Sequence, residues 1–243
     1  MFGSKKQPAT LVICGTAPRQ AGTARSAAWL DAARALSVPV TWLAGIDSLA
    51  EISSPGRIER SIDLALDIPP AACGSKAKLR DLLQRAHDAV PSVTAVALRG
   101  PTPLDNRGLL VEHGITVALV NGFEDDARGS RRPAPRGWPC RNSVWGLWEV
   151  QVTPHRPRGI AGWLGLGGMP KPKAGGLHVL RTEGVAVGNN GTAFITPRLE
   201  RWIAWAGQKR FGGGAVLAGL SSLPGVIAGE GRAAMSGSVL RAA

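Results

Sequence analysis

The sequence contains no tyrosine and only four phenylalanines, although it has eight tryptophans. Proteins that bind single-stranded nucleic acid stack bases on aromatic rings spaced among basic residues, so this composition gives that class little support. No apolar run approaches the roughly 20 residues that span a bilayer. Thr10–Cys14, which follows Lys5 and Lys6, is too short for the apolar core of a signal peptide. We therefore expect no membrane span.

Cysteines and acidic residues are also few. The three cysteines are far apart and odd in number, which fits a reducing compartment and predicts a cytoplasmic protein. Asp and Glu total 17 against 29 Lys and Arg, giving a formal charge of +12. Much of the excess is arginine, in 128–141 and 156–158. This charge indicates either non-specific binding to a polyanion such as nucleic acid, or a solvated arginine-rich surface without a specific partner.

The remaining sequence alternates between short apolar runs and amphipathic segments. The apolar runs predict strands over Thr10–Cys14, Val38–Leu43, Ser61–Ile68, Val93–Leu98, Ile115–Val120, Val144–Thr153, Leu177–Leu180 and Ala215–Leu220. Helical periodicity predicts helices over 26–36, 48–52, 76–90 and 198–206, and a short helix that ends at Gly114. Alternating strands and helices indicate an α/β fold with a mainly parallel sheet, open or closed into a barrel.

The length allows a single domain. We expect one α/β domain over 10–228, a flexible N-terminus over 1–9 and a flexible tail over 229–243. Residues 121–142 and 154–175 are rich in Arg, Pro and Gly and predict loops.

Arg99 is the first candidate site residue. It directly follows the strand predicted over 93–98, and Gly100 and Pro101 then end any strand. The carboxyl ends of parallel strands are where α/β folds place their sites. Arg99 therefore either stands in such a site or forms a structural ion pair at the rim of the sheet.

Four segments together carry a family resemblance. They are LRGPTP at 98–103, GITVAL at 114–119, LWEVQVT at 147–153 and GLHVL at 176–180. In this order and spacing the chain resembles the NodB-type polysaccharide deacetylases from about Thr10 to Ile227. The resemblance implies an irregular (β/α) barrel and zinc-dependent hydrolysis of N-acetyl groups on carbohydrates. It further implies that His178 is the general acid and that Arg99 is a catalytic-site residue.

The departures from that family concern its metal site. Active members carry two aspartates at the end of the first strand, where this chain has VICGTAP at 12–18. They carry an H-x-x-x-H pair after the third strand, where this chain has LALDIPPAACG at 64–74, with Asp67 near the first of the pair. A hydrolytic zinc needs about three protein ligands and an open position for water. The residues therefore predict no zinc cofactor and a degenerate, inactive member that binds a saccharide or a protein partner at the barrel mouth.

An active hydrolase with an unusual site, or a basic nucleic-acid-binding protein, remains an alternative. Cys14 and Cys73 both follow strands, and with Asp67 and His178 they are candidates for a soft metal site, or for small apolar core residues. The segment 15–22, GTAPRQAG, precedes a predicted helix as a phosphate cradle would, but it matches neither nucleotide-binding glycine motif.

The last candidates are aromatic and acidic. Trp148 lies with Trp138, Trp145 and Trp163 around the basic loop, where indole faces could bind sugar rings or pack in the core. The acidic run 124–126 could supply paired carboxylates or form a solvated loop.

The carboxyl ends of parallel strands meet on one face, so four candidates should converge there. We expect Cys14, Asp67, Arg99 and His178 at one mouth of the barrel. Arg99 should pair with Asp67, or else with Glu149, because an unpaired buried guanidinium is costly.

Overall fold

The computed structural model describes residues 7–17, 36, 38–52, 62–122, 138–153, 171–187 and 193–229. The strands are β1 (Ala9–Thr16), β2 (Thr41–Ala44), β3 (Asp63–Ile68), β4 (Ala95–Leu98), β5 (Val117–Val120), β6 (Cys140–Val144), β7 (Leu147–Gln151), β8 (Leu177–Glu183), β9 (Val185–Val187), β10 (Ala193–Ile195) and β11 (Ala215–Leu217). The helices are α2 (Ile46–Ile52), α3 (Pro70–Cys73), α4 (Lys76–Ala89), α5 (Leu104–Glu112) and α7 (Pro197–Phe211), and residues 223–229 are also helical. Within these ranges no helix has the length and apolarity to span a bilayer.

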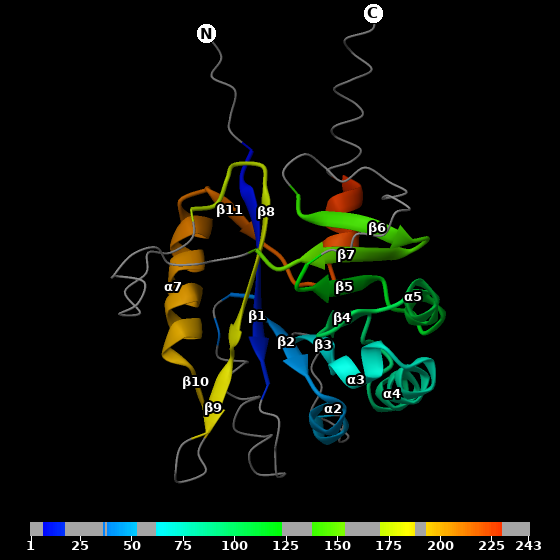
Figure 1. The fold of residues 1–243 in the computed structure, drawn as a ribbon. Helices are drawn as coiled ribbons and strands as arrows, with labels where there is room; N and C mark the ends of the chain where they lie inside the picture. The colour runs from blue at the N-terminus through cyan, green and yellow to red at the C-terminus, as the bar shows by residue number, and fades with distance from the viewer. Residues whose placement is uncertain are drawn as a thin grey trace, which may run out of the picture.

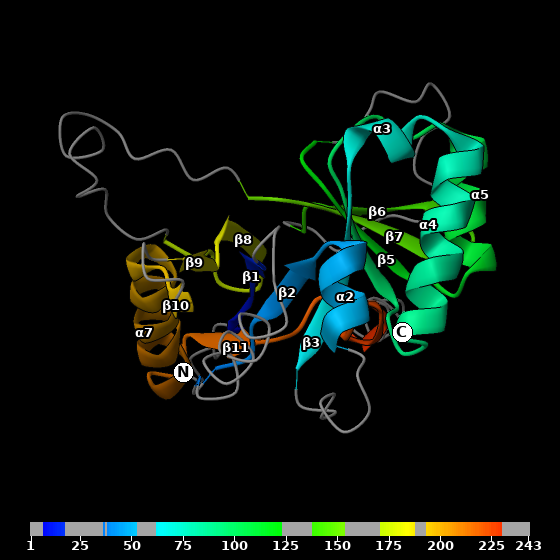
Figure 2. The ribbon, with the colours of Figure 1, turned by 90° about the horizontal axis from the view of Figure 1, so that it is seen from below.

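The main sheet is mostly parallel and follows chain order through its centre. β1, β2, β3, β4 and β5 are successive parallel neighbours, and β7 adds to β5 in the same sense. β8 runs parallel along the other side of β1, while β11 pairs with the first residues of β1. Figures 1 and 2 show this sheet curling, and α2, α3, α4, α5 and α7 pack on its outer side. The prediction of an α/β fold with a barrel-like, mainly parallel sheet is confirmed.

The two sides of the curled sheet meet at Thr153. Its backbone N–H donates to the carbonyl of Val179 in β8 at 2.8 Å, and its hydroxyl accepts from the Val179 N–H at 3.0 Å. Thr153 directly follows β7, so the sheet closes through single residues rather than through a full strand ladder. The enclosed face is therefore shielded from water and needs apolar side chains.

Alternating residues separate an inner core from an outer one. In β1, Val12 and Cys14 belong to the inner cluster, and Leu11 and Ile13 belong to the outer cluster. Figure 1 shows α7 beside β1 and β8, and α3, α4 and α5 on the other side of the molecule. The amphipathic stripe of α4 is buried, as its sequence predicted. The inner core also includes apolar residues of the helical segment 223–229.

The amino ends of the strands are closed by a hydrogen-bonded plug. Asp63, at the start of β3, accepts hydrogen bonds from the hydroxyls of Thr41 and Ser221 and, at 2.7 Å, from the N–H of Leu220. Leu220 leads directly into the helical segment 223–229.

Several local predictions were wrong. The segment 144–153, predicted as one strand, is instead the second half of a hairpin. It contains a turn at Trp145 and Gly146, where Gly146 has a φ of +90°, and then β7. The first strand of the hairpin, β6, begins inside the loop predicted over 121–142. β8 continues past Leu180 to Glu183, and the β9–β10 hairpin and the helical segment 223–229 were not predicted. The predicted helix over 26–36 lies outside the described residues except for its last residue.

Candidate functional site at the carboxyl ends of the strands

Asp67 and Arg99 form a two-point ion pair across adjacent strands. Arg99 Nε donates to Asp67 Oδ1 at 2.6 Å, and Arg99 Nη2 donates to Asp67 Oδ2. Asp67 pairs in register with Ala97, whose side chain is in the inner core, so Asp67 also faces inward. The hydrogen bond to Asp67 raises the pKa of Arg99 further above its ordinary value. The predicted partner of Arg99 is confirmed.

Arg181 brings a third strand to this pair. It stands on β8 in register with Cys14, and its Nη2 lies 3.9 Å from Asp67 Oδ1. Its Nη1 donates to Asn121 Oδ1, just after β5, at 3.5 Å. The sequence analysis missed Arg181 because it ended this strand at Leu180. The sequence did contain a pattern that indicates the longer strand. Leu177, Val179 and Arg181 occupy alternate positions, which face the same side of a strand.

Cys14 lies inside the barrel next to this group. Its thiol is fully buried, and burial, followed by the negative charge of Asp63, raises its pKa to about 12. The positive charge of Arg181 and a hydrogen bond with Thr41 act in the opposite direction. The thiol is therefore protonated at neutral pH, which makes it a poor nucleophile and a poor metal ligand.

His178 does not converge with Asp67 and Arg99. It precedes Val179, which faces the inner core, so its side chain lies on the outer face of β8, and it pairs with Leu11 near the start of β1. Its Nε2 accepts a hydrogen bond from the N–H of Lys173 at 2.9 Å, which places the ring proton of a neutral imidazole on Nδ1. Burial, and then the charge of Lys173, lower the pKa of His178. The prediction that His178 shares one mouth with Asp67 and Arg99 is wrong.

Cys73 also lies elsewhere. It belongs to the outer core on α3, where its Sγ is 3.7 Å from the carbonyl oxygen of Ile68 and its own carbonyl accepts from Asn106 Nδ2 at 2.8 Å. In the part of the chain that the structure describes, no three His, Cys, Asp or Glu residues are placed to hold a metal ion. Cys14, Cys73, Asp67 and His178 therefore do not form the soft metal site considered above.

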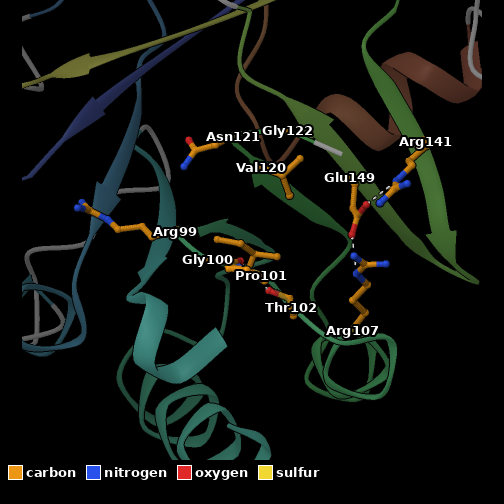
Figure 3. A pocket seen from close by; sticks show the side chains of 11 residues that line it. Arg99, Gly100, Pro101, Thr102, Arg107, Val120, Asn121, Gly122, Arg141 and Glu149 are labelled. Atoms are coloured by element: carbon orange, nitrogen blue, oxygen red, sulfur yellow. Dashed lines mark hydrogen bonds and ion pairs between the residues drawn. The ribbon is translucent and has the colours of Figure 1, made fainter. Parts of the chain in front are cut away.

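A second charged group surrounds Glu149 on β7. Its side chain is 1% exposed, with Oε1 lying 2.8 Å from Arg107 Nε and Oε2 accepting from Arg141 Nε at 2.7 Å. Arg107 comes from α5 and Arg141 from β6, and Figure 3 shows Glu149 between them. Glu149 was a sequence candidate, but both arginines were missed. Arg107 was not singled out in the short helix, and Arg141 lay in a stretch interpreted as loop.

A cavity of about 220 Å³ lies beside the Glu149 group; from the other group Arg99 lines it, whereas Asp67 and Arg181 do not. The cavity is enclosed by the ends of β4 and β5, the loop that leads into α5, and the hairpin of β6 and β7. Its lining residues are Leu98, Arg99, Gly100, Pro101, Thr102, Arg107, Val120, Asn121, Gly122, Arg141 and Glu149. Figure 3 shows the guanidinium of Arg99 turned away from the cluster of Glu149, Arg107 and Arg141. The cavity therefore has its charged wall on the side of Glu149.

The described tryptophans are not grouped around this cavity. Trp148 is partly buried against the inner core, in register with Val117 at the start of β5. Trp138 is buried and donates from Nε1 to the carbonyl of Gly175 at 2.8 Å, whereas Trp145 is 71% exposed at the hairpin turn. Trp148 thus has the surroundings of a core residue, and its sugar-binding role stays a prediction. Trp163 and the acidic run 124–126 lie outside the described residues.

The comparisons with known proteins do not show a family for this chain. No family model and no curated protein matches the chain. A family 4 carbohydrate esterase from Streptomyces lividans, solved in complex with acetate, is similar to this chain at 15% sequence identity and a TM-score of 0.34. The match covers 47% of this chain and 62% of that chain, which is less than two thirds of its length. The α/β assignment therefore depends on the sheet topology described above.

Proposed function

We propose that the chain is a degenerate polysaccharide deacetylase-like protein that does not deacetylate, and that it binds a ligand, a saccharide or a protein partner, at the carboxyl ends of its barrel strands. The observation that carries the proposal is the pairing of Asp67 with Arg99. Asp67 is the carboxylate nearest to the place where the family resemblance puts a metal ligand. In this chain both of its oxygens are occupied by a guanidinium.

The zinc ion that the family resemblance implies does not fit the described residues. Zinc takes thiolate, neutral imidazole or free carboxylate ligands. Here the nearest thiol, Cys14, has a pKa raised to about 12, and the nearest carboxylate is held by Arg99. His178 faces the other side of β8. These side chains supply neither a zinc site nor a base that activates water.

One experiment separates this proposal from an active hydrolase with an unusual site. The protein is purified without chelator, its zinc content is measured, and acetate release from an N-acetylated oligosaccharide is followed with and without added zinc. We expect substoichiometric zinc and no acetate above the level given by heat-unfolded protein. Stoichiometric zinc together with acetate release that a chelator abolishes would establish the hydrolase instead.

The proposal includes a cytoplasmic location, because Cys14, Cys73 and Cys140 are all buried free thiols. The net charge of +12 supports additional, non-specific binding of polyanions. Binding to heparin or random-sequence DNA that disappears steeply with salt and shows no sequence preference is the expected result. Tight, sequence-dependent binding would favour the nucleic-acid-binding alternative.

A further inference from the structure

Three segments lie side by side at the amino ends of β1, β8 and β11. The N–H of Ala9, in β1, donates to the carbonyl of Gly214 just before β11 at 3.1 Å, and the N–H of Gly175, just before β8, donates to the carbonyl of Gln7 at 2.8 Å. Figure 1 shows the end of α7 that leads to β11 on the same side of the molecule as the starts of β1 and β8. The end of α7 and the segment 171–176 are therefore separated by little more than the width of β1.

This part of the surface carries four exposed cations. Lys171 and Lys173 precede β8, and Lys209 and Arg210 lie in the last turn of α7. Among the ion pairs and side-chain hydrogen bonds of the described residues, none involves these four side chains. The dipole of α7 favours cations in its last turn, which accounts for Lys209 and Arg210 but not for the two lysines before β8.

The carboxylates of these elements are too far away to neutralise the four cations. β1 and β11 contain no acidic residue, Glu183 is the last residue of β8, and Glu200 lies in the first turn of α7. The rise along a helix places Glu200 about 13 Å from Lys209, and the rise along a strand places Glu183 about 20 Å from the start of β8. Both distances exceed the Debye length of about 8 Å at physiological ionic strength.

Asp63, at the start of β3, is also remote from these cations. It pairs in register with Thr41, which itself pairs with Cys14 of β1. Cys14 lies five positions beyond Ala9, which corresponds to about 16 Å along the strand. The carboxylates of β3, β8 and α7 therefore leave the positive charge at the start of β1 and β8 uncompensated.

Phe211 ends α7 directly after Lys209 and Arg210. Its side chain is 92% exposed, more than any other large hydrophobic side chain of the described residues. Water contact with a whole phenyl ring is unfavourable, and the ring gains free energy wherever a partner buries it. We call Lys171, Lys173, Lys209, Arg210 and Phe211 the basic corner. Cations that surround an exposed aromatic ring are the combination with which peripheral proteins contact anionic lipid.

The aromatic residues of α7 favour a lipid surface over single-stranded nucleic acid. Successive bases stack on several aromatic rings along a positively charged groove. In α7, Trp202 is buried and Trp205 packs against the outer core, so Phe211 is the one ring that the helix exposes. A single ring inserts into a lipid surface but provides no stacking platform for a strand.

We propose that the basic corner docks the protein on an anionic lipid surface. Phe211 enters the boundary between the headgroups and the acyl chains, and the four cations face the headgroups. This inference goes beyond the proposed function and does not depend on it, because the basic corner lies at the opposite ends of the strands from Asp67, Arg99 and the cavity. Either proposal can fail without the other.

Vesicle binding tests the charge complementarity. Full-length protein is mixed with vesicles of phosphatidylcholine alone or of phosphatidylcholine with phosphatidylserine, and bound protein is measured by co-sedimentation. We expect binding only to the vesicles that contain phosphatidylserine, weakened by salt. Lys209→Gln combined with Arg210→Gln should weaken it roughly 25-fold, because each cation near an anionic surface contributes about fivefold.

The matched control removes the same charge from another part of the surface. Lys76 and Lys78 are exposed in the first turn of α4, on the other side of the molecule (Figure 1). Lys76→Gln combined with Lys78→Gln should change binding by about twofold or less, because these lysines lie beyond the screening length from a surface that contacts α7. Non-specific attraction by the net charge of +12 would instead weaken both double variants equally.

The ring of Phe211 is tested separately from the charges. Phe211→Ala keeps all four cations and should weaken binding about tenfold, the loss expected when one aromatic side chain no longer enters the lipid. Phe211→Trp should restore it. Leu104→Ala, at the start of α5, removes another exposed apolar side chain and should leave binding unchanged.

Four results would overturn the proposal. They are no binding to vesicles with phosphatidylserine, equal losses in the two double variants, unchanged binding in Phe211→Ala, and tighter binding of a single-stranded oligonucleotide that the same variants abolish. The last result would assign the basic corner to nucleic acid. Every substituted side chain is exposed, except that Leu104 is only 37% exposed. Circular dichroism establishes that each variant is folded before its binding is measured.

Discussion

Arg99 and Asp67 lie 32 positions apart in the chain and contact each other at two points at the carboxyl ends of β3 and β4. The pair joins neighbouring strands, and Arg181 extends it to β8 on the other side of the barrel mouth. These residues therefore link strands that enclose the inner core. Their arrangement is that of a brace across the carboxyl ends of β3, β4 and β8.

Replacing Arg99 should destabilise the fold. Arg99→Gln leaves Asp67, whose side chain is 11% exposed, with only the longer contact to Arg181. We expect the free energy of unfolding to fall by about 1–2 kcal/mol, since removing one partner of a mostly buried pair exposes the other to an unfavourable environment. Urea unfolding gives the value. Arg201→Gln should change it by less than about 0.5 kcal/mol, and equal effects of the two changes would show that Arg99 has no special role.

The buried thiols predict a loss of stability at alkaline pH. Burial raises the pKa of Cys14 from 9.0 to about 12, and Cys140 behaves in the same way. Above pH 9 the unfolded chain loses these thiol protons while the folded protein keeps them, so stability is complete below pH 9 and falls as pH rises towards 12. The slope should reach about 1.4 kcal/mol per pH unit for each thiol.

The chain has no tyrosine, so no phenol titrates in this range and the effect of the thiols is easier to isolate. Denaturant unfolding as a function of pH measures the slope. Cys14→Ala should lower the slope by the contribution of one thiol, about 1.4 kcal/mol per pH unit. An unchanged slope in Cys14→Ala, or rapid reaction of native Cys14 with a thiol reagent just above pH 9, would contradict the prediction.

His178 should take up its proton at a lower pH than an unburied histidine does. Burial and the charge of Lys173 lower its pKa in the folded state, so the unfolded chain binds the proton first as pH falls. Stability that is present above pH 6.5 should therefore be lost as pH falls through the lowered pKa of His178. Proton NMR of the four histidines, with His178→Gln for assignment, gives the titration directly. A midpoint for His178 above 6.5 would contradict the described surroundings of the ring.

The sequence was sufficient to predict the central strands and one contact of the site. Each of β1 to β5 is a short apolar run followed by a polar or proline-containing segment, and the order of parallel strands follows from the intervening helices. Asp67 and Arg99 could be matched because each ends such a run. In that region, local pattern and tertiary structure agree.

The other parts of the site could not be predicted, for reasons tied to particular residues. Three of the five residues of β6 are polar, and β6 becomes a strand only by pairing with β7, so the composition favoured a loop around Arg141. Ending β8 at Leu180 hid Arg181. His178 was assigned by resemblance, although strand alternation puts it on the opposite face from Val179. The cluster at Glu149 brings together side chains from one helix and two strands. Such a contact between distant segments cannot be predicted from a local sequence pattern.

The plug at the amino ends of the strands offers a sharp test with two glycines. A Cβ on Gly219 would lie 2.6 Å from Asp63 Oδ2, which also accepts from the N–H of Leu220 at 2.7 Å. Gly219→Ala should therefore force Asp63 away from its partners and cost about 1–3 kcal/mol, the usual range for overpacking. Gly225, in the helical segment 223–229, has no atom within 4 Å of such a Cβ. Gly225→Ala should be neutral or stabilise by up to about 1 kcal/mol, because alanine favours the helix. Urea unfolding of the two variants measures both values, and a Gly219→Ala protein as stable as Gly225→Ala would mean that Asp63 does not hold the plug in place.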